Sequence, residues 1–293
     1  MMHSRMIFNI SPPKSGTTAM YHCLARCQNV AKPKVKEPRF FARKLGPQIG
    51  NLPPRLNLDG RFHLGFQWFE GLYKSQSRYR LDFSTYYAAT EMTPEIMHAY
   101  DEQAKLLLIL RDPVERILSH YYHYAKTGVA LPPIRHLMRP ETALSRYLMR
   151  FADYAGIYER FAAQFGEEQI CVLDFRDLSL NPHTVEAQIQ NFLALPDFQF
   201  NPKGREINPS GRAKSLMLQR LLSGRHAQLL SQLAPFSHDR LLEMRRRVVA
   251  WNTRAQKNPT PDTALLQALQ EQLAPQYRFL NDLFEGEGMC DAA

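Results

Sequence analysis

Residues 9–25, NISPPKSGTTAMYHCLA, have the composition of an anion-binding loop. Where an expected strand runs into an expected helix, the chain places Lys14, Ser15, Gly16, Thr17 and Thr18. The first N–H groups of such a helix, the positive end of its dipole and a lysine ammonium would converge on one anion. Gly16 would let the backbone approach the ligand, and the threonine hydroxyls would donate to phosphate oxygens.

The alternative to an anion site is a helix capped by Ser15 or Thr17 beside an exposed lysine. A Walker loop has its last glycine before the lysine, whereas here Lys14 precedes Gly16, which argues against an ATPase or GTPase.

A second candidate anion site lies in residues 106–124, LLLILRDPVERILSHYYHY. Arg111 follows a continuous apolar run, so we expect it at the carboxyl end of a buried parallel strand, where open α/β sheets bind ligands. Asp112 and Glu115 predict a helix that starts with a capping box. Arg111 and the Ser119 hydroxyl together suit a dianionic phosphate. The alternative makes Arg111 a surface ion-pair partner and Ser119 a packing residue.

The elements that would position these residues alternate along the chain. Apolar runs predict strands at 5–11, 78–83, 105–110 and 169–175, and helical spacing predicts helices at 17–27, 113–126, 144–165 and 183–194. This alternation predicts an α/β fold, a single P-loop-like domain with a central, mostly parallel sheet flanked by helices. Beyond about residue 211 three long segments have helical periodicity, and breaks that contain Pro or Gly separate them. We therefore expect one domain over 1–293, with an α/β nucleotide-binding core at 1–210 and a helical C-terminal part at 211–285.

Composition limits the class of protein. With 44% apolar and 22% charged residues, the chain is typical of a globular protein, and its net charge of +9 suits an anionic ligand without selecting one. Four scattered cysteines predict neither a disulfide framework nor a zinc site. Because the first residues carry no apolar run and no stretch could span a bilayer, we expect a soluble, cytoplasmic protein without integral membrane association.

Taken together, P-K-S-G-T-T and L-R-D-P-x-x-R-x-x-S-x-Y resemble motifs of the sulfotransferases that use 3′-phosphoadenosine 5′-phosphosulfate (PAPS). In the heparan-sulfate and glycan branch of that family, similar segments are found in the same order over about residues 5–210. These segments are KEPRFF at 36–41, HLGFQWFEGLY at 63–73, RLDFSTYY at 80–87 and FQFNPKGREIN at 198–208. The chain departs from that branch at Asp82-Phe83, where the heparan enzymes have Glu-Lys, and after the Lys-Gly pair, where Arg-Glu-Ile follows. It also lacks the Golgi anchor of animal members, so the resemblance implies a soluble bacterial-type enzyme.

The resemblance implies a role for each motif. The first would hold the 5′-phosphosulfate, with Lys14 at the bridging oxygen, and Arg111 and Ser119 would hold the 3′-phosphate. The late loop, with Lys203, Gly204 and Arg205, would cover the nucleotide. Sulfuryl transfer is an in-line displacement, so positioning and electrostatic stabilisation do most of the work. No metal is expected, and the nucleotide product is 3′-phosphoadenosine 5′-phosphate (PAP).

The acceptor hydroxyl also needs a base. By resemblance Glu37 is the catalytic base, and the alternative for this residue is an ion pair with Lys34 or Lys36. His63 is the second candidate base, and Asp82 would orient the acceptor or Lys14.

Two other functions remain open at this stage. A kinase would use a similar strand–loop–helix site but would need Mg²⁺ and ATP. A non-enzymatic polyanion- or RNA-binding protein would be supported by the net charge, the basic run at 244–249 and the many aromatic residues, although no RNA-binding signature is present and we expect no nucleic-acid partner. The sequence leaves the acceptor open among glycans, glycolipids and small molecules, and it does not predict the oligomeric state.

Overall fold

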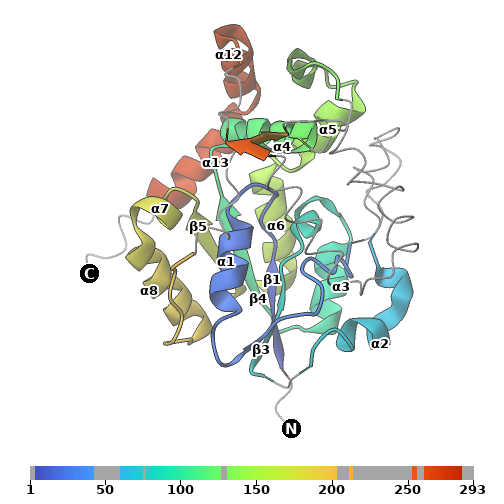
Figure 1. Cartoon of the computed structure of the whole chain (residues 1–293), viewed down its shortest axis with the longest axis vertical. Helices are drawn as coiled ribbons and strands as arrows, with labels where there is room; N and C mark the ends of the chain where they lie inside the picture. The colour runs from blue at the N-terminus through green and yellow to red at the C-terminus, as the bar shows by residue number, and fades with distance from the viewer. Residues whose placement is uncertain are drawn as a thin grey trace.

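The computed structural model describes residues 4–42, 60–74, 77–126, 131–202, 211–213, 253–255 and 261–285. Its centre is a five-stranded sheet with the order β2-β3-β1-β4-β5, and every pairing in it is parallel (Figure 1). The strands are β1 (Arg5–Asn9), β2 (Val30–Ala31), β3 (Tyr79–Asp82), β4 (Lys105–Leu110) and β5 (Ile170–Asp174). The four predicted strands are thus present, and the predicted α/β fold with a parallel sheet is confirmed. The two-residue edge strand β2 was not predicted.

Strand β4 shows why the sheet is buried on both faces. Its side chains alternate, so that Leu106, Leu108 and Leu110 enter one hydrophobic core while Leu107 and Ile109 enter the other. All five are fully buried, as expected of a central parallel strand. A continuous apolar run is therefore the sequence signal of a strand between two helical layers.

Helices form those two layers. The described α-helices are α1 (Thr17–Leu24), α2 (Gly65–Glu70), α3 (Thr93–Tyr100), α4 (Pro113–Lys126), α5 (Ala143–Arg150), α6 (Tyr154–Phe165), α7 (Asp177–Leu180), α8 (Pro182–Leu193), α12 (Thr263–Gln272) and α13 (Ala274–Glu285). Four short 3-10 helices accompany them, η2 (Phe62–Leu64), η3 (Thr85–Ala89), η4 (Ile134–Met138) and η5 (Glu167–Gln169). Helices α1 and α8 pack on the face that Leu107 shares, and α3, α4 and α6 pack on the opposite face.

The prediction of one helix over 144–165 is wrong, because the chain breaks between α5 and α6. Asp153 caps the second helix, and its Oδ1 accepts a hydrogen bond from the N–H of Gly156 at 3.2 Å. A side-chain acceptor at this position starts a new helix even though the apolar spacing continues across the break.

The C-terminal part is helical where α12 and α13 are described. It also contains a short antiparallel pair, β6 (Gly211–Ala213) with β7 (Thr253–Ala255), which lies outside the predicted helical segments. The predicted helical segments at 216–233 and 238–251 lie outside the described residues. Helix α13 packs against the core through side chains that include Tyr277 and Phe279, and the Tyr277 hydroxyl donates to Asp112 Oδ2 at 2.8 Å. The single-domain organisation remains a prediction that this contact supports.

Candidate active site

The loop of residues 14–18, hereafter the anion loop, joins β1 to α1 at the carboxyl edge of the sheet. Gly16 is the N-cap of α1 with φ 78°, and no side chain caps the helix. The first N–H groups of α1 have no acceptor within the helix, and its dipole adds positive potential at the same point. The capped alternative, with Ser15 or Thr17 closing the helix, is therefore not the arrangement found.

Ser15 gives an independent sign that the anion loop is built for a ligand. The residue is fully buried, and within the described structure its Oγ has no hydrogen-bond partner. A buried hydroxyl without a partner costs free energy, and an anion in the loop would supply the missing acceptor. Gly16 has a φ that residues with a Cβ rarely adopt, and a Cβ at this position would lie 2.5 Å from Leu178 Cδ1, so that side chain would have to move. These residues fit a bound phosphate or sulfate group.

Arg111 brings the two predicted motifs together. It follows β4 directly, and its Nη1 donates to the carbonyl oxygen of Lys14 at 3.4 Å. Its Cζ lies 4.4 Å from the ring centroid of Phe175, which holds the guanidinium over an aromatic face. The carboxyl end of β4 thus lies beside the anion loop, although the two segments lie about a hundred residues apart in the chain.

The same arginine also forms the ion pair that the alternative hypothesis requires. Arg111 Nη2 lies 2.9 Å from Glu115 Oε2, and Nε donates to the same oxygen at 3.2 Å. Asp112 caps α4 as predicted, since its Oδ1 accepts from the Glu115 N–H at 2.8 Å. The carboxylate of Glu115, however, pairs with Arg111 instead of completing the capping box. Glu115 thereby fixes the direction of the guanidinium at the edge of the sheet.

The other predicted site residues make fewer contacts with Arg111 and the anion loop. Ser119 lies half-buried on α4, two turns after the helix begins, and no hydrogen bond joins it to Arg111 in the described structure. His63 is exposed in η2, and among the described residues no hydrogen bond or ion pair links it to the anion loop. The predicted cover of the nucleotide, Lys203, Gly204 and Arg205, lies outside the described residues.

Lys36 connects Glu37 to the anion loop. Its Nζ donates to Thr18 Oγ1 at 2.9 Å and lies 3.7 Å from Glu37 Oε1. The predicted alternative for Glu37, an ion pair with Lys36, is therefore present, and that pair is also what places the carboxylate beside the loop. Burial raises the pKa of Glu37, while the charges of Lys36 and Arg39 oppose that rise. Burial likewise lowers the pKa of Lys36.

Backbone strain gathers in these two segments. Among the described non-glycine residues, four have positive φ angles, and three of them are Lys14 (77°), Glu37 (56°) and Arg39 (52°). This region of conformational space is unfavourable for residues with a Cβ, so surrounding contacts must enforce it. Strain concentrated at the anion loop and at the segment of the candidate base is typical of a functional site.

Asp82 enforces part of that strained geometry. It ends β3, is fully buried, and accepts hydrogen bonds from the Ser84 and Tyr87 hydroxyls at 2.6 and 2.5 Å. Those hydroxyls in turn accept from the N–H groups of Arg39 (2.8 Å) and Phe41 (3.4 Å). Two relays thus run from Asp82 to the backbone that follows Glu37. With no exposed surface, its carboxylate is placed to orient this segment.

The buried carboxyl of Asp82 should make stability depend on pH. Burial raises its pKa from 3.8 to about 7 against the opposing hydrogen bonds of Ser84 and Tyr87. Because the folded pKa is the higher one, this stabilisation is complete below the unfolded pKa and is lost as the pH rises toward 7. The free energy of unfolding of wild type, relative to Asp82→Asn, should fall by up to about 3 kcal/mol between pH 5 and 8. Urea unfolding at both pH values measures it, and a constant difference would contradict the assignment.

The sequence hypothesis did not include Lys36, Arg39 or Ser84 in the site. The sequence signal for Lys36 and Arg39 was weak, because KEPRFF contains several charged residues. Only the structure shows that Lys36 contacts the anion loop. Ser84 lies 45 residues from its partner Arg39, so no local pattern could have linked them.

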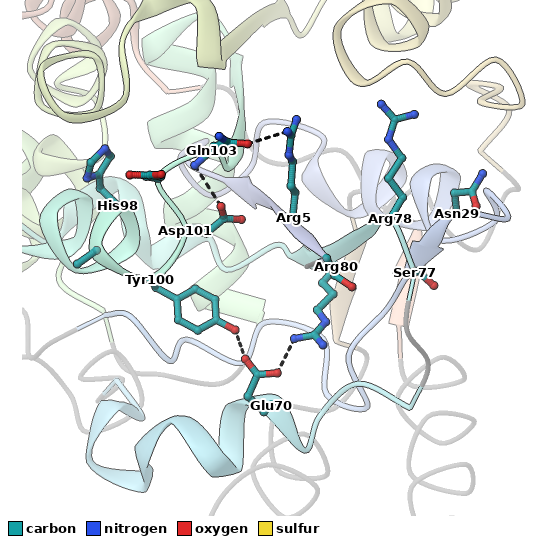
Figure 2. Close-up of a pocket in the computed structure, with 13 residues that line it drawn as sticks. Arg5, Asn29, Glu70, Ser77, Arg78, Arg80, His98, Tyr100, Asp101 and Gln103 are labelled. Atoms are coloured by element: carbon teal, nitrogen blue, oxygen red, sulfur yellow. Dashed lines mark hydrogen bonds and ion pairs between the residues drawn. The ribbon is translucent and has the colours of Figure 1, made fainter. Parts of the chain in front are cut away.

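A separate hollow of about 1640 Å³ opens at the amino ends of the strands (Figure 2). Its lining includes Arg5 at the start of β1 and Asp101 before β4, so it lies at the end of the sheet opposite the anion loop. Figure 2 shows Tyr100 and Arg80 converging on Glu70 across it. The Glu70 carboxylate is therefore already paired with Arg80 and Tyr100.

The fold and the site define a class of protein, a P-loop-like α/β protein with an anion site at the carboxyl edge of its sheet. The model of the sulfotransferase domain matches residues 4–203, which is more than half of the sequence. The chain therefore belongs to the PAPS-dependent sulfotransferase family, as its motifs predicted.

Known proteins agree with this assignment. The chain is 27% identical over 218 residues to mouse bifunctional heparan sulfate N-deacetylase/N-sulfotransferase 4, covering 66% of this chain and 22% of that protein. It is 24% identical over 243 residues to rat carbohydrate sulfotransferase 15, covering 64% of this chain and 43% of the relative. The chain thus spans less than half the length of these two relatives. A solved sulfotransferase from Alicyclobacillus acidocaldarius has the same fold, with a TM-score of 0.59 and 24% identity over 71% of this chain and 87% of that one.

The described residues were compared with the requirements of a metal site and of a membrane-spanning helix. Within them, no three His, Cys, Asp or Glu side chains gather where they could hold a metal ion. In the same part of the chain, each helix is too short or too polar to cross a bilayer.

Proposed function

We propose that this protein transfers a sulfuryl group from PAPS to an acceptor hydroxyl by in-line displacement. The observation that carries the proposal is the contact of Arg111 with the Lys14 carbonyl, because it joins two anion-binding motifs at one edge of the sheet. One anion loop alone would suit many phosphate ligands. Two sites side by side suit a nucleotide with phosphate groups at both its 5′ and 3′ positions.

Different residues are assigned to the two phosphate groups of PAPS. We assign Lys14, Ser15, Gly16, Thr17 and Thr18 to the 5′-phosphosulfate, and Arg111 with Ser119 to the 3′-phosphate. Lys203, Gly204 and Arg205 are assigned to the cover of the nucleotide by resemblance alone. PAPS supplies the sulfuryl group, and the Lys14 ammonium is the cation for charge that develops on the leaving oxygen. Lys36, bonded to Thr18, adds a second positive charge at the rim of the anion loop.

Glu37 is the proposed base that takes the proton of the acceptor hydroxyl. Its raised pKa makes the carboxylate a stronger base than an exposed glutamate. The strained backbone and the relays from Asp82 hold this segment in place, so Asp82 acts as a positioning residue. His63 remains the alternative base and would have to reach the site from an exposed position.

The acceptor is proposed to be a glycan. Beside Glu37, the Arg61 N–H donates to the carbonyl of Arg39 at 2.9 Å, and the Arg61 guanidinium lies 5.7 Å from the ring centroid of Trp68. An aromatic face next to guanidinium groups suits sugar rings that carry negative charge. The printed names of the relatives, heparan sulfate N-sulfotransferase and carbohydrate sulfotransferase, support the same class.

A transfer assay tests this function. PAPS labelled with ³⁵S should pass its label to at least one member of a panel of oligosaccharides, glycolipids and small alcohols, with mass spectrometry locating the modified oxygen. Transfer should continue in EDTA, because the proposed stabilisation comes from side chains and backbone N–H groups. Loss of transfer in EDTA that Mg²⁺ restores would contradict the metal-free mechanism.

Other outcomes would favour the alternative functions. Phosphate transfer from ATP would favour the kinase, and retention of RNA without any transfer would favour the nucleic-acid binder. Cell fractionation tests the cytoplasmic localisation, which stays a prediction of the sequence.

A further inference from the structure

Helix α13, drawn in red in Figure 1, contacts the residues around Arg111 from a distant part of the chain. The match to the sulfotransferase domain ends at residue 203, so this helix lies beyond it. Two neighbouring residues of α13, Gln276 and Tyr277, are half-buried and form hydrogen bonds with other elements. We call these two residues the α13 pair.

Tyr277 binds the residue that caps α4. Its hydroxyl donates to Asp112 Oδ2 at 2.8 Å, while Asp112 Oδ1 accepts from the Glu115 N–H, also at 2.8 Å. One carboxylate oxygen thus starts the helix, and the other is bound to α13. Because Glu115 is the ion-pair partner of Arg111, Tyr277 stabilises the turn from which both members of that pair project.

Gln276 caps the start of α6. Its Oε1 accepts from the backbone N–H groups of Tyr154 at 2.8 Å and of Ala155 at 3.3 Å. The Asp153 carboxylate accepts from the Gly156 N–H, so each of the first three N–H groups of α6 has a side-chain acceptor. These groups have no acceptor within their own helix, and an acceptor from a second helix therefore fixes where α6 begins.

Tyr154 connects this cap to Arg111. Its side chain is fully buried, and its hydroxyl donates to the Arg111 carbonyl oxygen at 2.8 Å. The side chain of Arg111 is bound separately, to the Lys14 carbonyl and to Glu115. Two series of contacts thus run from α13 to this residue, one through Tyr154 to its backbone and one through Asp112 to its partner Glu115.

Fixing Arg111 in advance matters for the binding of a phosphate. A guanidinium forms two parallel hydrogen bonds with phosphate oxygens only in one orientation. A long side chain loses rotamer entropy when it is fixed, and contacts that fix it before the ligand arrives reduce this cost. The side chain of Arg111 is 22% exposed, so burial alone does not fix it, and its neighbours must do so.

We infer that Gln276 and Tyr277 are positioning residues that orient Arg111 toward the 3′-phosphate of the nucleotide. This inference rests on the proposed assignment of Arg111 to that phosphate. Neither member of the α13 pair is assigned a contact with the nucleotide. The C-terminal helix thereby increases the preference for a nucleotide that carries a 3′-phosphate over one that lacks it.

Tyr277→Phe and Gln276→Met test the two series of contacts separately. The first removes one hydroxyl, and the second replaces the amide with an apolar side chain of similar length. Each variant should bind PAP about fivefold more weakly, the effect of losing one orienting hydrogen bond, and should bind adenosine 5′-monophosphate within about twofold of wild type. The double variant should bind PAP about twentyfold more weakly. Titration calorimetry of the full chain with both nucleotides measures these affinities.

Tyr79→Phe and Gln169→Met are the matched controls at the opposite end of the sheet. The Tyr79 hydroxyl donates to the Leu193 carbonyl at 3.0 Å, and the Gln169 amide donates to the carbonyls of Glu102 at 3.0 Å and Ala104 at 2.8 Å. Each control removes the same kind of hydrogen bond between elements as its counterpart in α13. Both should lose stability in urea unfolding, as the α13 variants do, and keep wild-type affinity for both nucleotides.

A further variant shows whether the α13 pair acts through Arg111. In an Arg111→Ala background, Tyr277→Phe should cause no further loss of PAP affinity, because the residue that it positions is absent. An additional fivefold loss in that background would contradict the inference.

The other outcomes separate this inference from the proposed function. Wild-type PAP affinity in both α13 variants would overturn the inference, and so would an equal loss of affinity for PAP and adenosine 5′-monophosphate, which would indicate a general loosening of the fold. If Arg111→Ala alone weakened PAP binding, the proposed function would stand without the α13 pair. If Arg111→Ala bound PAP as wild type does, the assignment of the 3′-phosphate would itself be wrong.

Discussion

Replacing Arg111 with alanine should weaken PAP binding by about a hundredfold. Arg111 is the proposed partner of the 3′-phosphate, and a charge-assisted hydrogen bond contributes about 1.5–3 kcal/mol. Its position over Phe175 and its ion pair with Glu115 hold the guanidinium before any ligand arrives. Lys14→Ala should weaken binding by a similar factor and should in addition lower the transfer rate by about a thousandfold, because it removes the cation at the leaving oxygen. Titration calorimetry with PAP measures the affinities.

Arg176→Ala is the control for the loss of one positive charge. Arg176 follows β5 at the same edge of the sheet, but it is mostly exposed and pairs with Asp174 at 2.6 Å. Its removal should leave PAP affinity within about twofold of wild type, as usual for an exposed ion pair. If Arg111→Ala and Lys14→Ala bound PAP as well as Arg176→Ala does, the assignment of both anion sites would be wrong.

Glu37→Gln should keep PAP affinity and lose turnover. Glutamine has nearly the same shape, so the contact of Lys36 with Thr18 and the strained backbone should persist. Without a carboxylate, the acceptor proton has no base, and a rate loss of about 10²–10⁴-fold is expected. Transfer rates with the acceptor found in the panel, alongside calorimetry with PAP, separate catalysis from binding.

The control for this substitution is Glu70→Gln, which alters a carboxylate in the hollow at the opposite end of the sheet. Its transfer rate should match wild type if the folded protein is intact. If Glu37→Gln kept the wild-type transfer rate, another residue would have to be the base. His63→Ala would then be the next variant to test.

Local patterns in the sequence predicted most of the fold. The apolar run of β4 and the proline-started helix α4 are determined by neighbouring residues, so a short window contains their signals. The break between α5 and α6 depends on one side chain, Asp153, within an uninterrupted apolar spacing, and the pattern alone hid it. The edge strand β2 has only two residues, too few to show a period.

The site was predictable only in part, because its contacts join distant segments. Arg111 follows β4 at the carboxyl edge of the sheet, as the sequence predicted, and the structure adds its contact with the Lys14 carbonyl. The link from Thr18 to Lys36 and the relay from Asp82 through Ser84 depend on side-chain directions that no spacing encodes. The hydrogen bond between the Tyr86 and Tyr147 hydroxyls joins residues 61 positions apart.

The measurement that tests the central claim most directly is calorimetry of the wild-type chain in EDTA with three ligands, PAP, adenosine 5′-monophosphate and ATP. The account predicts one PAP site per chain, binding that is about a hundredfold weaker without the 3′-phosphate, and no tighter binding of ATP when Mg²⁺ replaces EDTA. Tight, Mg²⁺-dependent binding of ATP together with no binding of PAP would contradict it.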